Sequence, residues 1–328
     1  MNKKLNFLKA IACFMVVMAH IRFPGFFGEV IWKVTAFTVP IFLMIAGYFS
    51  YGKKTDTIKR RLKQIAFVFL WAYASHFIFN VTKHLIKHDV LTWLAERFTW
   101  KTPIDYVLWG YVSFAIPLWY LVIMVEVYAF WYFVVRAGKE RFVLKLLPLL
   151  LVIYVGVAVF LESTDSPWYY CNLFLVRGLP FFLLGYYLRT EEAQKLLQWK
   201  RNQLISLTVF GFIIILTPTV LGLTIKFGDA GLIPCVLGLF ALALREPEKG
   251  ICQPLEFIGD KLSLYIYVFH MIIGGNIVLK ICKVLHVSIN EEIYAWFKPV
   301  LAVILTTIFS AVLYYVTEAL KKRKPLHV

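Results

Sequence analysis

The sequence is short of charge, and above all of negative charge. Its 328 residues include 35 Lys and Arg but only 19 Asp and Glu, and charged residues make up 16% of the chain. Soluble domains carry about 25% charged residues and are about 45–50% apolar, whereas this chain is 60% hydrophobic. A chain of this composition cannot cover a water-exposed surface, so it is predicted to be an integral membrane protein.

Three further absences narrow the interpretation. No small-x-small cleavage site follows the first apolar segment, which His20 interrupts, so the segment is predicted to be retained rather than removed as a signal peptide. No polar stretch is long enough for a soluble domain, because the longest one covers only residues 83–115. We therefore expect a single integral-membrane domain over residues 1–328. The five cysteines show no C-x-x-C and no metal-binding spacing, so they are predicted to be buried small residues: Cys13, Cys171, Cys235, Cys252 and Cys282.

Apolar segments of about 20 residues match a hydrocarbon core of about 30 Å. Their number predicts an all-α polytopic bundle of about ten transmembrane helices. The expected spans are residues 5–23, 30–50, 65–82, 116–135, 142–160, 171–188, 204–221, 229–244, 262–282 and 294–319. The segment 83–115 between the third and fourth spans is expected to form short amphipathic helices on the membrane surface.

The positive charges indicate the orientation of the bundle. With ten spans, 22 Lys and Arg fall in the loops on the side of the termini, 7 in the opposite loops and 6 within the spans. Because cytoplasmic loops carry the excess of Lys and Arg, both termini are predicted to be cytoplasmic, in a multi-pass protein of the cell inner membrane. The net charge of +16 is thus explained by membrane topology and anionic lipid, and no nucleic-acid partner is expected.

The first span carries two ionisable residues on one face. Lys9 and His20 are eleven positions apart, so on a helix they lie within about 20° of the same face and roughly 16 Å apart along the axis. Ionisable groups inside a spanning helix usually face the bundle interior and mark function. Lys9 and His20 are therefore the leading candidates for a functional site.

The densest charge cluster is the first predicted cytoplasmic loop, KKTDTIKRRLKQ. One interpretation is a topology signal that also attracts anionic lipid headgroups. The alternative is a phosphate-binding patch, because Arg60 and Lys63 lie one helical turn apart and could bind a polyanionic cytoplasmic cosubstrate.

Other polar residues in the spans are possible acceptor-site residues or structural ion pairs. Glu126 is expected to be paired with a basic residue or to handle protons, and Arg177 to extend toward the outer interface or to pair with Glu126. His270 is expected near the membrane midplane and Trp119 at the outer interface. We derive no chemistry from the fifth, seventh and eighth spans.

His84 and His88 have the i, i+4 spacing of a metal-binding pair on a helix. No glutamate lies between them and the sequence offers no clear third ligand. We therefore predict no metal.

Several blocks of sequence resemble the integral-membrane acyltransferase 3 family. The family signature of a basic residue, ten positions and a histidine in the first span reads here Lys9-x10-His20, with lysine in place of the usual arginine. Further similar blocks follow in the same order, and together they run through nearly the whole chain: VPIFLMIAGYF, PLWYL, GLPFFLLGYYL and LSLYIYVFH.

The resemblance implies an acyltransferase that moves an acyl group, commonly acetyl, from cytoplasmic acyl-CoA to a hydroxyl or amine of a cell-envelope glycan or related, for example lipid-linked, acceptor. It implies that His20 is the catalytic residue. It also implies that Lys9, Arg60 and Lys63 stand where members have CoA-binding basic residues. Lys9 and Lys63 keep the charge of arginine but lose its bidentate fork. Acetyl-CoA would be the cosubstrate, and envelope-synthesis proteins are possible partners.

Two roles for His20 remain open. Its imidazole could take a proton from the acceptor as a general base, or it could be acylated itself as a covalent relay. Two other functions are considered. A small-solute transporter would resemble the membrane domain of serine racemases, although no inverted repeat relates the two halves of the chain. A catalytically silent scaffold would leave Lys9 and His20 without a purpose.

Overall fold

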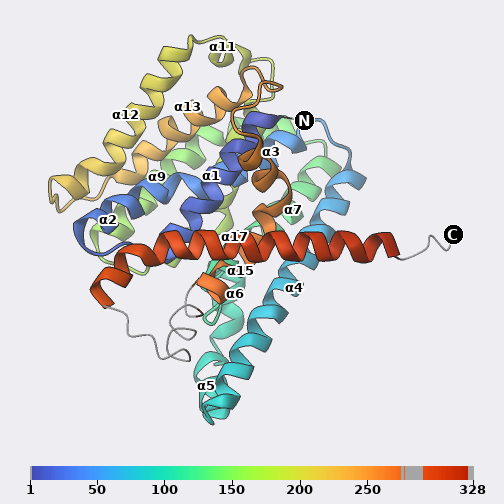
Figure 1. The fold of residues 1–328 in the computed structure, drawn as a ribbon. Helices are drawn as coiled ribbons and strands as arrows, with labels where there is room; N and C mark the ends of the chain where they lie inside the picture. The colour runs from blue at the N-terminus through green and yellow to red at the C-terminus, as the bar shows by residue number, and fades with distance from the viewer. Residues whose placement is uncertain (1, 275–276, 278–290, 324–328) are drawn as a thin grey trace. The chain divides into compact units, whose positions relative to one another are not determined.

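Helices are the regular secondary structure of the residues that the computed structural model describes, which are 2–274, 277 and 291–323 (Figure 1). No strand occurs among them, which confirms the all-α prediction. Within this described part of the chain, six helical segments are long and apolar enough to cross a membrane: Gly25–Ser50, Thr55–Ile86, Ile116–Arg136, Arg201–Val220, Gln253–Gly274 and Glu291–Lys322.

The remaining predicted spans fall on shorter helical segments. Three of these are apolar: Leu147–Ser163, Phe174–Tyr187 and Gly228–Leu244. The first predicted span is helix α1 (Lys3–His20), whose 18 residues include Lys3, Lys4 and Lys9. Of the ninth predicted span, residues 275, 276 and 278–282 lie outside the described residues. Ten crossings and cytoplasmic termini stay predictions.

The structure describes four of the five cysteines and the whole segment 83–115. Three of the predicted buried cysteines are buried, Cys252 is partly exposed, and Cys282 lies outside the described residues. The segment 83–115 contains two short helices, α5 (Val90–Arg97) and α6 (Thr102–Trp109), as expected. Their position on a membrane surface stays a prediction.

Three predicted spans are interrupted helices. Residues 30–50 run through α2 (Gly25–Val34), the 3-10 turn η1 (Thr35–Phe37) and α3 (Thr38–Ser50), and the turn ends three residues before Pro40. Proline cannot donate its backbone nitrogen and clashes with the carbonyl four residues earlier, so it favours such a break. Residues 142–160 divide into α8 (Glu140–Lys145) and α9 (Leu147–Ser163), the latter with proline in its first turn.

The third interrupted span, residues 171–188, has the most irregular backbone. It consists of the 3-10 turn η3 (Trp168–Asn172), the π-helical turn η4 (Phe174–Gly178) and α10 (Leu179–Tyr187). A second π-helical turn, η6 (Ile258–Leu262), lies between α14 (Gln253–Phe257) and α15 (Ser263–Gly274). Single π-helical turns occur frequently at functional sites, so η4 and η6 are candidate positions for functional residues.

By their contacts the residues divide into two compact units. The terminal unit comprises the described parts of residues 1–38 and 242–328, and the central unit comprises residues 39–241. The terminal unit joins α1 and α2 to α14, η6, α15 and α17 (Glu291–Arg323), so it brings the two ends of the sequence together. The single domain over residues 1–328 stays a prediction.

Within the terminal unit, small residues allow helices to touch at the backbone. A Cβ atom on Gly259 of η6 would lie 1.8 Å from the carbonyl oxygen of Asn6 on α1. A Cβ atom on Gly274 of α15 would lie 2.7 Å from Ile21 and 2.7 Å from Ala302 of α17. The backbone contact at Gly259 therefore requires glycine, whereas at Gly274 the side chains of neighbouring helices pack closely on it, in the manner of close helix packing in membranes.

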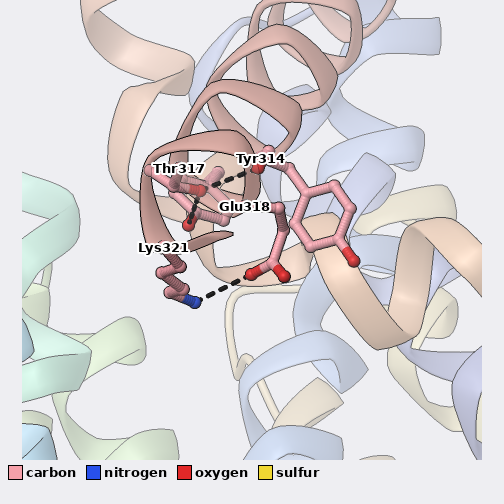
Figure 2. Close-up of polar contacts among 5 residues, drawn as sticks. Tyr314, Thr317, Glu318 and Lys321 are labelled. Carbon is pink, nitrogen blue, oxygen red and sulfur yellow. Dashed lines mark hydrogen bonds and ion pairs between the residues drawn. The ribbon is translucent and has the colours of Figure 1, made fainter. Parts of the chain in front are cut away.

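Helices α15 and α17 pack antiparallel. Tyr265 near the start of α15 lies 3.3 Å from Thr317 near the end of α17, hydroxyl to hydroxyl. The Phe269 and Phe309 rings meet at 5.2 Å, and Gly274 at the end of α15 meets Ala302. Within α17, the Lys321 ammonium donates to the Glu318 carboxylate at 2.8 Å (Figure 2). The end of α17 is thus attached to the start of α15.

The start of α1 is attached to the loop after α13 (Leu232–Leu244). The Asn2 side chain accepts a hydrogen bond from the Leu5 amide at 2.8 Å and caps the helix. The Lys3 amide donates to the Pro247 carbonyl at 2.8 Å, and the Lys4 ammonium lies 3.1 Å from the Glu246 carboxylate. The hydrogen bond from Lys4 holds the pKa of Glu246 below its usual value.

The central unit comprises α3 to α13. Helices α3 and α10 meet through two glycines, because a Cβ on Gly47 would lie 1.8 Å from the Phe182 carbonyl oxygen and one on Gly185 would lie 1.9 Å from that of Met44. Helix α7 (Trp119–Arg136) packs on α10 through Trp131, whose ring lies 5.3 Å from that of Phe182. A Cβ atom on Gly211 of α12 (Arg201–Val220) would lie 2.4 Å from the backbone of α13.

Candidate active site

Helix α1 carries the two residues that the sequence singles out. His20 is the last residue of α1, where the Ile21 amide still donates to the Val17 carbonyl at 2.9 Å. The helix cannot continue much further because Pro24 follows and Gly25 adopts a positive φ of 62°. Lys9 lies three helical turns earlier, so the expected rise between the two residues holds along a regular helix.

His20 is in ring contact with His270. The two imidazole centroids are 5.2 Å apart, and the planes are tilted by 36°. His20 is partly exposed, whereas the His270 side chain is fully buried. The structure thus brings together two candidate residues that are 250 positions apart in the sequence.

The hydrogen bonding of His270 indicates which of its ring nitrogens carries a hydrogen. Its Nδ1 lies 2.7 Å from the carbonyl oxygen of Tyr267 on the preceding turn. Because a carbonyl oxygen only accepts, Nδ1 must carry the hydrogen and donate it. In the neutral ring, Nε2 is then the acceptor nitrogen. The hydrogen bond to the backbone of its own helix fixes the orientation of the ring beside His20.

The contact between the two histidines depends on a close approach of helices. His270 lies one turn before Gly274, and the backbone of Gly274 touches both Ile21 and Ala302. Because Ile21 directly follows His20, this glycine contact holds the end of α1 against α15. A Cβ atom at position 274 would meet the Ile21 Cδ1 and the Ala302 Cβ, so these side chains would have to shift.

Lys9 faces an acidic residue that the sequence analysis did not select. The carboxylate of Asp260, in the π-helical turn η6, acts electrostatically on the Lys9 ammonium. The neighbouring Gly259 packs against α1 so closely that a Cβ atom on it would lie 1.8 Å from the Asn6 carbonyl oxygen and 3.0 Å from the Ala10 nitrogen. This contact brings Asp260 near Lys9. Asp260 also pairs with Lys261 at 2.8 Å.

Arg60 and Lys63 lie near the start of α4 (Thr55–Ile86) in the central unit, and both side chains are exposed. The neighbouring Arg61 differs, because its guanidinium donates to the Ser50 hydroxyl at 3.1 Å. Arg61 therefore has a structural contact within the protein, whereas the Arg60 and Lys63 side chains are accessible to a ligand.

Arg177 does not pair with Glu126, and that alternative is wrong. Its guanidinium donates to the Asn172 side-chain oxygen at 3.0 Å and lies 5.5 Å from the Trp119 ring centre. Among the described residues, Glu126 forms no ion pair either, although its side chain is partly buried on α7. The two residues come from π-helical and α-helical segments that turn them toward different neighbours.

The cluster around Arg177 includes residues from spans that were expected to carry no chemistry. The Tyr154 hydroxyl of α9 donates to the Asp229 carboxylate of η5 (Gly228–Gly231) at 2.6 Å. Tyr154 is fully buried, and both residues interact electrostatically with Arg177. The only sequence signal was an Asp at the edge of an apolar run, because a tyrosine in such a run is ordinary.

The Tyr154–Asp229 hydrogen bond is expected to stabilise the central unit. Tyr154→Phe leaves the carboxylate without its donor, at a cost of about 1.5–3 kcal/mol in the free energy of unfolding. The measurement is the unfolding equilibrium of the purified protein in mixed micelles. Tyr315→Phe is the control, because Tyr315 is 61% exposed. Equal stability of the two variants would contradict the prediction.

His84 and His88 do not form a pair. His84 Nδ1 lies 2.7 Å from Asp89, while His88 is exposed. In the part of the chain that the structure describes, no group of three or more His, Cys, Asp or Glu could hold a metal ion.

The fold and this site define a class: a polytopic α-helical membrane protein with two imidazoles in contact in one of its units. Comparison with protein families then identifies the family to which the chain belongs. The model of the integral-membrane acyltransferase 3 family, described as an acyltransferase domain, matches residues 2–316. The chain therefore belongs to this family and is a membrane acyltransferase, as its sequence motifs indicated. Searches among curated proteins and among solved structures found no significant match.

Proposed function

We propose that the protein transfers an acetyl group from cytoplasmic acetyl-CoA to a hydroxyl or amine of a cell-envelope glycan or related acceptor in the inner membrane. The observation that carries the proposal is the contact of His20 with the buried His270 in a chain of this family. An imidazole held in one orientation suits both proton abstraction and acyl capture.

Both routes balance chemically. As a general base, His20 takes the acceptor proton while the acceptor oxygen or nitrogen attacks the thioester carbonyl. The C–S bond breaks, and the thiolate of CoA receives the proton. As a relay, an imidazole nitrogen of His20 first forms a C–N bond to the acetyl group and releases CoA, and the acceptor then takes the acetyl group. Incubation with radiolabelled acetyl-CoA without acceptor separates the routes, since only the relay leaves label on His20.

His270 acts in this proposal as a positioning residue. His270→Ala removes the ring that contacts His20, so we expect turnover to fall by about tenfold or more, equivalent to about 1.4 kcal/mol, with little change in the KM for acetyl-CoA. His270→Phe keeps a ring in place and should recover part of the loss. A rise in KM with unchanged turnover would contradict the positioning role.

Arg60 and Lys63 are proposed to bind the phosphates of CoA. Replacing both by alanine should raise the KM for acetyl-CoA, by at most about 1 kcal/mol or roughly fivefold for each exposed charge. The effect should shrink as salt screens the charges. Lys139→Ala is the matched control, because Lys139 is exposed and lies in another predicted cytoplasmic loop. Equal KM values for the double variant and the control would count against the assignment.

The experiment that tests the function compares envelope glycans of cells with and without the gene by mass spectrometry. Loss of one acyl substituent, restored by the wild-type gene, is the expected result. In parallel, the purified protein should bind acetyl-CoA. Absence of acetyl-CoA binding together with measurable solute uptake would favour a transporter instead.

A further inference from the structure

A polar cavity of about 350 Å³ lies in the central unit, where α4 ends. Its volume is at the lower end of the range of small-molecule sites, about 300–1,000 Å³. The side chains that line it come from the end of α4, from α5 and from the segment before α7. Those with charged or amide groups are Asn80, Lys83, His84, Asp89, Glu96 and Arg97.

The turn after α4 builds one wall of the cavity. His88 adopts a positive φ of 59°, which reverses the chain, and the Asp89 amide donates to the His84 carbonyl at 3.1 Å. The Asp89 carboxylate then meets His84 Nδ1 at 2.7 Å. On its other side the His84 ring stacks on Trp93 of α5, with centroids 5.0 Å apart and planes at 15°. The imidazole is thus fixed between an acid and an indole.

Hydrogen bonds also fix the Asn80 side chain in another part of the cavity wall. The Asn80 side-chain nitrogen donates to the His76 carbonyl at 2.8 Å and to the Phe114 carbonyl at 3.3 Å. These bonds attach the segment before α7 to α4. Because both use the nitrogen, they leave the Asn80 side-chain oxygen as an acceptor at the cavity wall.

The cavity and the basic residues lie at opposite ends of one continuous helix. From Arg60 to His84 the axis of α4 rises roughly 36 Å, which exceeds a hydrocarbon core of about 30 Å. If Arg60 and Lys63 meet CoA at the cytoplasmic surface, the cavity therefore lies beyond the opposite face of the membrane. That is the side on which the acceptor of a trans-membrane transfer would be found.

The charges of the cavity select a class of ligand. Lys83 and Arg97 are cationic, Asp89 and Glu96 are anionic, and the wall therefore carries both donors and acceptors. Because the two cations and the two carboxylates balance, the wall favours neither an anion nor a cation, and an acyl chain would have to bury charged groups against apolar surface. A polyhydroxylated neutral compound suits this wall, because every hydroxyl both donates and accepts.

We propose that this cavity binds the sugar-like, hydroxyl-bearing part of the acceptor. The inference rests on the proposed acetyl transfer only for the role of the ligand, since binding itself requires no turnover. Glu96 and Asp89 accept hydrogen bonds from sugar hydroxyls, and Arg97 donates to them.

The test measures binding of methyl glycosides of glucose, galactose and N-acetylglucosamine to the protein in nanodiscs, by saturation-transfer NMR without acetyl-CoA. We expect at least one glycoside to bind the wild type and to bind Glu96→Gln and Asp89→Asn about tenfold more weakly, as lost charged hydrogen bonds imply. His88→Asn is a control on the same turn, since asparagine tolerates its positive φ. Glu191→Gln is a control for loss of an exposed carboxylate.

Several outcomes would overturn the proposal. These are the absence of binding of every glycoside to the wild type, equal binding to the wild type and both cavity variants, and preferential binding of inorganic phosphate at this cavity. Retained acetyl-CoA binding by Glu96→Gln shows that the variant is folded. Glycoside binding without acetyl-CoA cleavage would contradict the proposed acetyl transfer but support the proposed ligand of the cavity. Acetyl-CoA cleavage without glycoside binding would support the proposed acetyl transfer but contradict the proposed ligand of the cavity.

Discussion

His20→Ala is expected to abolish acetyl transfer in a protein that still inserts and folds. Loss of a general base costs about 10²–10⁴-fold in rate, and loss of a covalent relay removes its route entirely. The measurement is the release of CoA thiol by the purified variant in nanodiscs with an envelope fraction as acceptor, together with mass spectrometry of the glycans of cells that carry the variant.

Controls separate chemistry from folding in this experiment. The variant should retain acetyl-CoA binding and wild-type thermal stability, because His20 is the last residue of α1 and is partly exposed. His20→Gln preserves hydrogen bonding without a basic nitrogen and should be equally inactive. Added imidazole should restore part of the activity of the alanine variant. Near-normal turnover of either variant would refute the catalytic role of His20.

Gly185→Ala and Gly47→Ala are expected to give the largest losses of stability. The added methyl groups would lie 1.9 Å and 1.8 Å from backbone carbonyl oxygens of the facing helix. Overpacking costs about 1–3 kcal/mol when side chains can adjust. Here the obstacle is backbone, so α3 and α10 must separate, and we expect a cost of about 3 kcal/mol or more in the free energy of unfolding.

Gly156→Ala is the matched control for these two variants. Gly156 lies in α9 with no heavy atom within 4 Å of the position of its Cβ. Alanine there should stabilise the helix by roughly 0.5–1 kcal/mol, because glycine has the higher conformational entropy when unfolded. The measurement is the unfolding equilibrium in mixed micelles. If the Gly47→Ala protein were as stable as the Gly156→Ala protein, α3 and α10 would not be in backbone contact.

The helical part of the fold follows from local pattern, and so does the candidate site on α1. Runs of apolar residues marked the spans, and the period of the helix placed Lys9 and His20 on one face. Interruptions were harder to foresee, because apolar composition is the same in a straight helix and in the π-helical segment around Arg177. The partners of the charged residues were also missed: Asp260 beside Lys9, and Asn172 instead of Glu126 beside Arg177.

The sequence by itself determined that this protein is a helical membrane acyltransferase and that His20 lies on the same face of its helix as Lys9. The helices and the shared face follow from hydrophobicity and from hydrogen bonds within one helix, which act over a few residues, whereas the acyltransferase class follows from the family match. Only the tertiary structure decided that the His270 ring contacts the His20 ring and that a polar cavity forms at the end of α4. Such arrangements depend on which helices can approach closely, and small residues such as Gly259, which contacts the backbone of α1, allow that approach between segments far apart in the chain.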